Sequence, residues 1–244
     1  MVRFCRPRLR QTACPPGHSH RSVQNMSTRR ANIGCGQTPT EGWRNFDNSP
    51  SIRLAAIPVL PDLLARIGLL GAPSYRFVQF ARTHRIELMN AAKPWPLAGD
   101  SFEVIYSSHM VEHFDPSEAR TFLAEARRVL APGGILRLAL PDIERLIENY
   151  VRERDADAFM SSLHVCSPRQ TSLEGRVGLF LYGNRRHNWM YDARSLCRLV
   201  SASGFTDVRS LSAGETTIPD PGALDLAERE SESIYIEARK PRPA

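Results

Sequence analysis

The sequence feature that best indicates the fold is a strongly patterned helix with a short apolar run on each side. Residues 102–106 are rich in β-favouring side chains, and residues 135–140 are almost entirely apolar, which is typical of strands covered on both faces. Between them, Asp115 can cap a helix and Pro116 suits its first turn. Apolar residues then recur at helical spacing: Ala119, Phe122, Leu123, Ala126, Val129 and Leu130. Strand, helix and strand with short connections predict a right-handed βαβ unit.

The same pattern continues toward the end of the chain. Helices are expected from about Asp142 and from about Asp192, and strands near Val208 and over residues 234–238. Alternating helices and strands predict an α/β fold, a mostly parallel sheet flanked by helices on both faces. In such folds ligands bind in the crevice beyond the carboxyl ends of the strands.

The 244 residues suit a single domain, which we place at residues 31–244. Residues 1–30 have no apolar periodicity and no hydrophobic core of a secretory signal. We predict a disordered Arg-rich tail, with Met26 as an alternative start. A targeting or nucleic-acid-binding tail is the competing interpretation.

The positive charge of the chain is concentrated in that tail. The net charge is +6, but the first 25 residues hold five arginines and no acidic residue, leaving 27 basic against 26 acidic side chains. A nearly neutral remainder argues against a nucleic-acid partner. The five cysteines form no C-x-x-C pair, and no apolar run is long enough to span a membrane. A reducing, cytoplasmic location is therefore expected.

A glycine pair follows the first predicted strand, in Ala-Asn-Ile-Gly-Cys-Gly at residues 31–36. Glycine permits positive φ and lets backbone N–H groups approach a ligand closely. A nicotinamide dinucleotide site would want a third glycine where Pro39 stands, and an acidic residue farther along than Asp47. A nicotinamide cofactor is thus disfavoured, and a plain turn is the other alternative.

Four segments in order carry a family resemblance: the glycine pair, Gly-Trp-Arg-Asn-Phe-Asp at 42–47, Ser-Phe-Glu-Val-Ile-Tyr-Ser-Ser-His-Met-Val-Glu-His at 101–113, and Arg-Val-Leu-Ala-Pro-Gly-Gly-Ile-Leu-Arg at 128–137. Together they resemble the S-adenosylmethionine-dependent methyltransferases of the Rossmann-like class, and most closely the type 11 methyltransferase domain. The resemblance implies a closing antiparallel hairpin, S-adenosyl-L-methionine as cofactor and methyl transfer as activity.

The resemblance also implies roles for individual residues. The glycine loop, formed by Gly34, Cys35 and Gly36, would lie against the methionine part of the cofactor. Asp47 would accept hydrogen bonds from the ribose hydroxyls. Only residues 37–42 separate the loop from the second predicted strand, so the first helix is expected to shrink to about one turn.

Two further segments complete the cofactor site that the resemblance implies. Asn90 and Ala91 match the loop that contacts adenine, where the family usually has aspartate; an amide can both donate to and accept from the adenine edge. Ser108 and His109 match the end of the fourth strand, where the backbone passes the sulfonium and the acceptor pocket opens.

The segment from His109 to His113 also spells H-x-x-E-H, a zinc-peptidase pattern. That chemistry needs both histidines on one sustained helix. Here His109 directly follows a strand and a new helix cap comes at Asp115, so one turn at most is available. We therefore predict no metal site, and a zinc hydrolase stays a distant alternative.

Two regions are expected to shape the choice of acceptor. Leu63, Leu64, Ile67 and Leu70 predict a covering helix packed on the sheet, with a lid or lipid-binding surface as the alternative. The second region, residues 184–192, carries Arg185 and Arg186, which suit an anionic group. We predict Arg186, Trp189 and Tyr191 as acceptor contacts; the alternative is a solvated turn with Trp189 anchored in the core.

Methyl transfer from a sulfonium is an in-line displacement, in which alignment and a dry pocket matter most. A general base is needed only for a hydroxyl or protonated nitrogen acceptor. His109 is the first candidate and His187 the second, since imidazole titrates near neutrality. The predicted partner is a small-molecule, glycan or lipid acceptor. A non-catalytic cofactor-binding protein or partner subunit is the main alternative.

Overall fold

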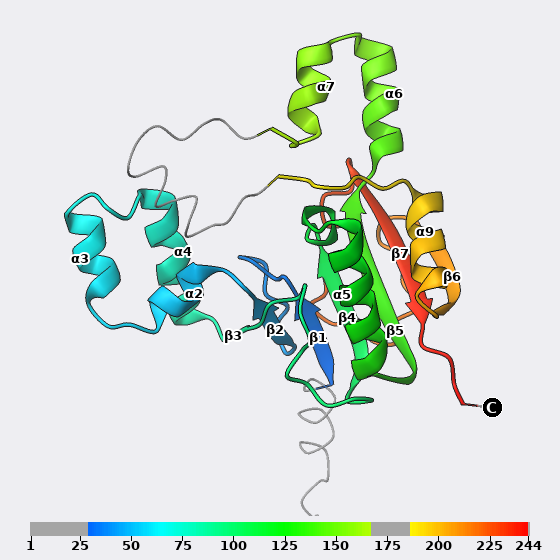
Figure 1. Ribbon diagram of the computed structural model, residues 1–244, viewed down its shortest axis with the longest axis horizontal. Coiled ribbons are helices and arrows are strands. Elements are labelled where there is room, and N and C mark those ends of the chain that lie inside the picture. Colours follow the sequence, from blue (N-terminus) through cyan, green and yellow to red (C-terminus); the bar gives the residue numbers. More distant parts are fainter. Residues whose placement is uncertain (1–28, 167–185, 244) are drawn as a thin grey trace, which may run out of the picture.

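The computed structural model describes residues 29–166 and 186–243 and has a seven-stranded sheet at its centre (Figure 1). The strand order is β3-β2-β1-β4-β5-β7-β6; β1 to β5 pair in parallel, and β7 pairs antiparallel with both β5 and β6. The strands are β1 (Arg30–Ile33), β2 (Arg44–Asp47), β3 (Ile86–Leu88), β4 (Phe102–Ser108), β5 (Leu130–Pro141), β6 (Thr206–Leu211) and β7 (Ser233–Arg239). The predicted α/β fold, with its mostly parallel sheet and closing antiparallel hairpin, is confirmed.

The described helices are α2 (Pro50–Ala55), α3 (Leu60–Arg66), α4 (Ala72–Thr83), η1 (Val111–His113), α5 (Pro116–Val129), α6 (Ile143–Glu153), α7 (Ala156–Ser162) and α9 (Ala193–Ala202). None of them is long and apolar enough to cross a membrane. The predicted tail lies outside the described residues except at its end, where Arg30 already opens β1. Arg185 also lies outside them.

Helix α5 forms where the sequence predicted it. The carboxylate of Asp115 accepts hydrogen bonds from Ser117 N and Glu118 N, and the Glu118 side chain returns to Asp115 N, which is a complete capping box. Such a cap contributes about 1 kcal/mol. Five residues of the predicted stripe are fully buried: Ala119, Phe122, Leu123, Ala126 and Val129. Leu130, the last predicted member, is also buried but opens β5 instead. The βαβ unit of β4, α5 and β5 is therefore confirmed.

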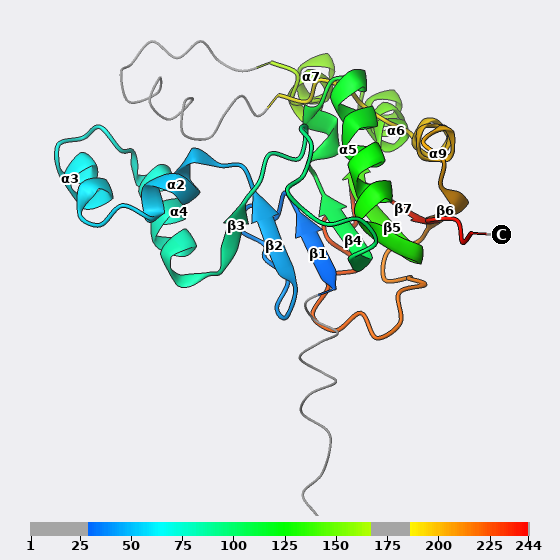
Figure 2. The ribbon, with the colours of Figure 1, turned by 60° about the horizontal axis from the view of Figure 1, so that its bottom comes forward.

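The other face of the sheet is covered differently. A second apolar cluster joins Val104, Tyr106 and Tyr235 to Ile218 and Leu224, and among the residues the structure describes it contains no helical residue. The segment between β6 and β7 lies over this face (Figure 2). Among the described residues, this long connection therefore covers the face on which the sequence predicted further helices.

A buried ion pair fastens that connection to the sheet. Arg137 and Glu237 face each other on neighbouring strands at 2.7 Å, and both are at most 2% exposed. Arg137 donates further hydrogen bonds to the carbonyl oxygens of Glu215 and Leu226, and Glu237 accepts from Thr217 N and Oγ1. Burial tends to raise the pKa of Glu237, but these hydrogen bonds outweigh it and hold that pKa below its ordinary value.

The helices α2, α3 and α4 lie together beyond the β3 edge of the sheet (Figure 1). Helix α3 contacts α2 and α4, so the prediction that it packs on the sheet is wrong. Asp62 holds it to α4 by accepting hydrogen bonds from Tyr75 and Arg82. Of the predicted stripe, Leu70 is buried, whereas Leu63 and Ile67 are 52% and 58% exposed.

The connection between β1 and β2 is a ten-residue loop that contains no helix. The sequence had predicted about one helical turn there. Side chains replace the missing helix. Asn45 exchanges hydrogen bonds with the backbone N–H and carbonyl of Thr40, and Asn32 donates to Thr40 Oγ1 at 3.1 Å. These buried amides fix the returning loop against the first two strands.

The late helices also begin where predicted, with Asp142 and Asp192 as N-caps of α6 and α9. Leu196 and Val200 of α9 are buried as expected. On α6 only Leu146 is buried.

Candidate functional site

The predicted cofactor residues come together at the carboxyl ends of β1 and β2. Gly34 N and Cys35 N both donate to the carbonyl of Phe46, at 2.8 and 3.0 Å. Asp47 ends β2, and its carboxylate accepts hydrogen bonds from Gly36 N at 3.0 Å and from Ser49 N at 2.7 Å. The predicted register of the second strand therefore places Asp47 directly beside the glycine loop.

The two glycines of the loop serve different purposes. Gly34 has φ +76°, and a Cβ there would come within 2.5 Å of Met110 Sδ. Gly36 has φ +51°, and a Cβ there would meet nothing within 4 Å. Gly34 is thus required by protein packing, whereas Gly36 leaves backbone open to a ligand.

Between them, Cys35 contributes its backbone rather than its thiol. The side chain is buried, and burial raises the pKa of the thiol, with the nearby Asp47 adding to the shift. The sulfur therefore stays protonated and apolar in character.

The turn after β3 adjoins the same acid. Met89 N donates to the carbonyl of Asp47 at 3.0 Å. Asn90 uses its Oδ1 to accept from Ala92 N at 3.0 Å, and Ala91 is 7% exposed. Asn90 and Ala91 therefore directly follow the residue whose backbone bonds to Asp47, at the carboxyl end of β3.

The end of β4 carries an unusual backbone conformation. His109 follows Ser108 with φ +46°, and its N–H bonds to the carbonyl of Ala139 at 2.9 Å. A non-glycine residue in this region is strained, and such strain gathers at functional sites. Its Nε2 lies 2.8 Å from the buried Ser233 Oγ, and its Nδ1 lies 3.6 Å from Glu112 Oε1.

The structure brings together two regions that lie far apart in the sequence. Residues 186–189 run beside the η1 turn, where Asn188 N and Trp189 N both donate to the carbonyl of Glu112, at 2.8 and 3.1 Å. Asn188 Nδ2 donates to the carbonyl of His113 at 2.6 Å, and His113 Nδ1 lies 2.8 Å from the Arg186 carbonyl. The predicted acceptor segment is therefore fastened to the turn that follows β4.

The predicted acceptor contacts differ in exposure. Trp189 is 49% exposed, so the alternative that anchored it in the core is wrong. Tyr191 occupies the core position instead, 4% exposed, and burial raises the pKa of its phenol. Arg186 is exposed beside His113. Trp189 and Arg186 thus present their side chains outward and Tyr191 does not.

His187 is the most unexpected of the predicted residues. It is 8% exposed, and burial lowers its pKa to about 4 despite the opposing effect of Glu112. Its ring meets the rings of His113 and His164 edge to face, at centroid distances of 5.1 and 5.2 Å. Its Nε2 lies 3.9 Å from Glu112 Oε1. The second candidate base therefore lies within a group of histidines around one buried carboxylate.

The H-x-x-E-H pattern does not form a peptidase site. Residues 111–113 make a single 3₁₀ turn, and His109 turns toward Ser233. Glu112 and His113 instead meet His187 from far along the chain. Sequence spacing gave no signal for that third residue.

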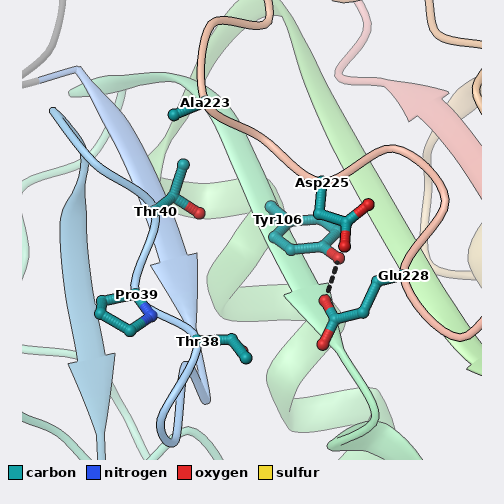
Figure 3. Close-up of a pocket in the computed structure, with 7 residues that line it drawn as sticks. All are labelled: Thr38, Pro39, Thr40, Tyr106, Ala223, Asp225 and Glu228. Atoms are coloured by element: carbon teal, nitrogen blue, oxygen red, sulfur yellow. Dashed lines mark hydrogen bonds between the residues drawn. The ribbon is translucent and has the colours of Figure 1, made fainter.

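A small hollow of about 160 Å³ lies on the second face of the sheet, lined by Thr38, Pro39, Thr40, Tyr106, Ala223, Asp225 and Glu228. Figure 3 shows Tyr106 pointing toward Glu228, to which its hydroxyl donates at 2.8 Å. Burial raises the pKa of Tyr106, and Glu228 adds to the shift. None of the predicted site residues lines it, so the hollow is separate from the predicted cofactor site.

The sheet order, with its parallel strands and closing antiparallel hairpin, is that of the Rossmann-like methyltransferase fold. More particularly, a family model described as a methyltransferase domain matches residues 72–138, from α4 into β5. This match supports S-adenosylmethionine-dependent methyltransferase activity, with S-adenosyl-L-methionine as the cofactor. Among curated proteins, none matches the sequence.

Solved structures with a similar chain trace include a SAM-dependent methyltransferase, possible histamine N-methyltransferase, from Thermotoga maritima (18% identity, 87% of this chain and 82% of that one, TM-score 0.47). A SAM-dependent methyltransferase from Methanosarcina mazei has 13% identity and a TM-score of 0.49; the match covers 92% of this chain and 99% of that one. Phosphoethanolamine N-methyltransferase 2 of Haemonchus contortus, in complex with S-adenosyl-L-methionine, has 11% identity and a TM-score of 0.45; the match covers 88% of this chain and 49% of that one. This chain spans about half the length of the last protein. None of the three bears on the acceptor of this chain.

Proposed function

We propose that this protein moves the methyl group of S-adenosylmethionine to a small-molecule, glycan or lipid acceptor by in-line displacement. The observation that carries the proposal is the contact between Gly36 N and Asp47 Oδ2 at 3.0 Å. It places an open backbone segment and a carboxylate at the carboxyl ends of adjacent parallel strands. That arrangement suits a ligand that has both an amino-acid part and a ribose.

The cofactor would lie along this edge of the sheet. Residues 34–36 would face its methionine part. Asp47 would accept hydrogen bonds from its ribose hydroxyls, either in addition to the bond from Gly36 N or replacing it. Asn90 and Ala91 would contact adenine, and Ser108 would lie beside the sulfonium at the end of β4.

The acceptor would then approach from the side of residues 186–189. Trp189, with half of its surface exposed, offers an apolar face, and Arg186 offers a cation for a phosphate or carboxylate group. Both are held near the end of β4 by their bonds to the η1 turn. An anionic acceptor is favoured on this ground.

The reaction itself needs little acid–base chemistry. The acceptor atom attacks the methyl carbon as the carbon–sulfur bond breaks, the electron pair leaves with sulfur, and the cation becomes a neutral thioether. For a hydroxyl acceptor we assign His109 as the base. The acceptor oxygen would replace Ser233 Oγ at Nε2, while Glu112 at 3.6 Å from Nδ1 stabilises the imidazolium. His187 is the weaker candidate because it is enclosed beside Glu112.

The experiment is methyl incorporation from radiolabelled cofactor by the full chain, against panels of small molecules, glycans and lipids. The proposal expects time-dependent label in an extracted acceptor, with stoichiometric S-adenosylhomocysteine. Cofactor binding without transfer to any panel member, even at high protein concentration, would contradict it. That result would favour the non-catalytic cofactor-binding protein or partner subunit.

A further inference from the structure

The side chain of Glu112 is the most unusual buried group in the described structure. It is 1% exposed, and neither carboxylate oxygen has a hydrogen-bond partner among residues 29–166 and 186–243. A carboxylate removed from water without compensation is costly enough that folded proteins normally pair it or use it to bind a metal. The position of Glu112 therefore calls for a partner.

The groups around this carboxylate are imidazoles. His187 Nε2 lies 3.9 Å from Oε1, and the ligand atoms of Glu112, His113 and His187 all lie within 4.8 Å of one another. The first distance is too long for a direct hydrogen bond. Two ligands on one tetrahedral zinc ion, with bonds of about 2.0–2.1 Å, lie about 3.4 Å apart. A modest closure of these side chains would bring them to that spacing.

The outer contacts favour metal binding by His113. Its Nδ1 lies 2.8 Å from the carbonyl of Arg186, which can only accept, so Nδ1 carries the proton and the lone pair is on Nε2. A ligand histidine almost always donates its other nitrogen in this way, which fixes the tautomer and the ring.

The backbone around the cluster is also fixed. The Glu112 carbonyl accepts from Asn188 N and Trp189 N, and Asn188 Nδ2 donates to the His113 carbonyl. These bonds hold both chain segments in place. The three side chains therefore converge from a backbone that is already ordered.

We propose that Glu112, His113 and His187 bind one divalent transition-metal ion, with zinc the best fit to two imidazoles and one carboxylate. Such a set leaves a coordination position for water or a further ligand. His109 Nδ1 lies 3.6 Å from Glu112 Oε1, the oxygen that also faces His187 Nε2, and would be an outer partner of the carboxylate. The ion would link residues 186–189 to the turn after β4. This proposal does not depend on methyl transfer.

Metal content tests the proposal directly on the full chain. Protein stripped with chelator, dialysed against zinc and desalted should retain about one zinc per chain by elemental analysis. Cobalt in place of zinc should give the visible absorption of a tetrahedral or five-coordinate site. Less than stoichiometric zinc, or a cobalt spectrum of the hydrated ion, would overturn the proposal.

Variants identify the ligands. Glu112→Gln keeps the shape but removes the charge, and His187→Ala removes one imidazole; each should weaken zinc affinity at least tenfold. His84→Ala is the matched control, since His84 is an exposed histidine at the end of α4 and should bind zinc as the wild type does. Wild-type affinity in both ligand variants would contradict the assignment. Loss of folding in a variant leaves the wild-type stoichiometry and cobalt spectrum to decide.

Discussion

The Gly36 amide and the Asp47 carboxylate, 11 residues apart in sequence, are joined by a 3.0 Å hydrogen bond. The bond closes a loop that has no helix, and Asn45 and Asn32 hold the rest of that loop through Thr40. The carboxylate is thus held in place by the protein itself. In the proposed cofactor site, such preorganisation would reduce the ordering cost of binding.

Gly36→Ala should impair cofactor binding more than folding. The new methyl group would enter the open space where a ligand is expected, and φ +51° costs an L-residue about 1–2 kcal/mol. Gly68→Ala is the matched control, because Gly68 has φ +72° and equally open surroundings far from the site. Calorimetric titration and urea unfolding of both variants separate the two effects. Equal cofactor affinity in the two variants would contradict the placement of the loop.

Gly34→Ala should fail differently. Its Cβ would lie 2.5 Å from Met110 Sδ, so the variant must move Met110 as well as strain the backbone. We expect a lower free energy of unfolding than for Gly36→Ala, by about 1–3 kcal/mol. Urea denaturation of the two variants checks this order. A Gly34→Ala protein as stable as Gly36→Ala would show that Met110 moves freely.

His109→Ala should slow turnover by about 10²–10⁴-fold if the acceptor is a hydroxyl, while S-adenosylhomocysteine binding persists. The matched control is again His84→Ala, which should leave the rate unchanged. Initial rates with saturating acceptor provide the measurement. Wild-type turnover with a hydroxyl acceptor would remove His109 from the role of base.

Removing Arg137 should destabilise the protein strongly. Arg137→Ala leaves the Glu237 carboxylate buried without its cation and frees the carbonyls of Glu215 and Leu226. Breaking a buried pair of this kind costs about 3–5 kcal/mol. The exposed Arg152, paired with Glu153 on α6, gives a control: Arg152→Ala should cost less than about 1 kcal/mol. Similar losses in urea unfolding would contradict the role assigned to the buried pair.

The same pair predicts how stability depends on pH. The pKa of Glu237 lies below its ordinary value of 4.5 in the folded protein, so the unfolded chain binds the proton first as pH falls. The contribution of Glu237 is fully present above pH 4.5 and is lost as pH falls through the folded pKa. Unfolding free energies of wild type and Glu237→Gln should therefore converge at acid pH. A difference that stays constant from neutral to acid pH would contradict this.

The sequence predicted the parts of the fold that depend on local pattern. The helix cap at Asp115, the stripe of α5 and the runs of β4 and β5 are each specified within a few residues. Helix α3 was misplaced because an apolar stripe does not say what it packs against, and its partner is α4.

In the candidate site, the sequence marked the glycine loop just after the short strand β1 and Asp47 at the end of β2. Their roles toward a cofactor stay predictions. The meeting of Glu112 with His187 was not predictable, because it depends on how residues 186–189 cross the η1 turn, a contact between distant segments. The exposure of Trp189 and the burial of Tyr191 follow from the same crossing.

Calorimetric titration of the full chain with S-adenosylhomocysteine, repeated on Asp47→Ala, tests the central claim most directly. The exposed Asp157→Ala on α7 serves as the matched control. We expect one binding site per chain, at least tenfold weaker in Asp47→Ala and unchanged in Asp157→Ala. No binding by folded wild-type protein, or equal binding by all three proteins, would contradict a cofactor site at Asp47.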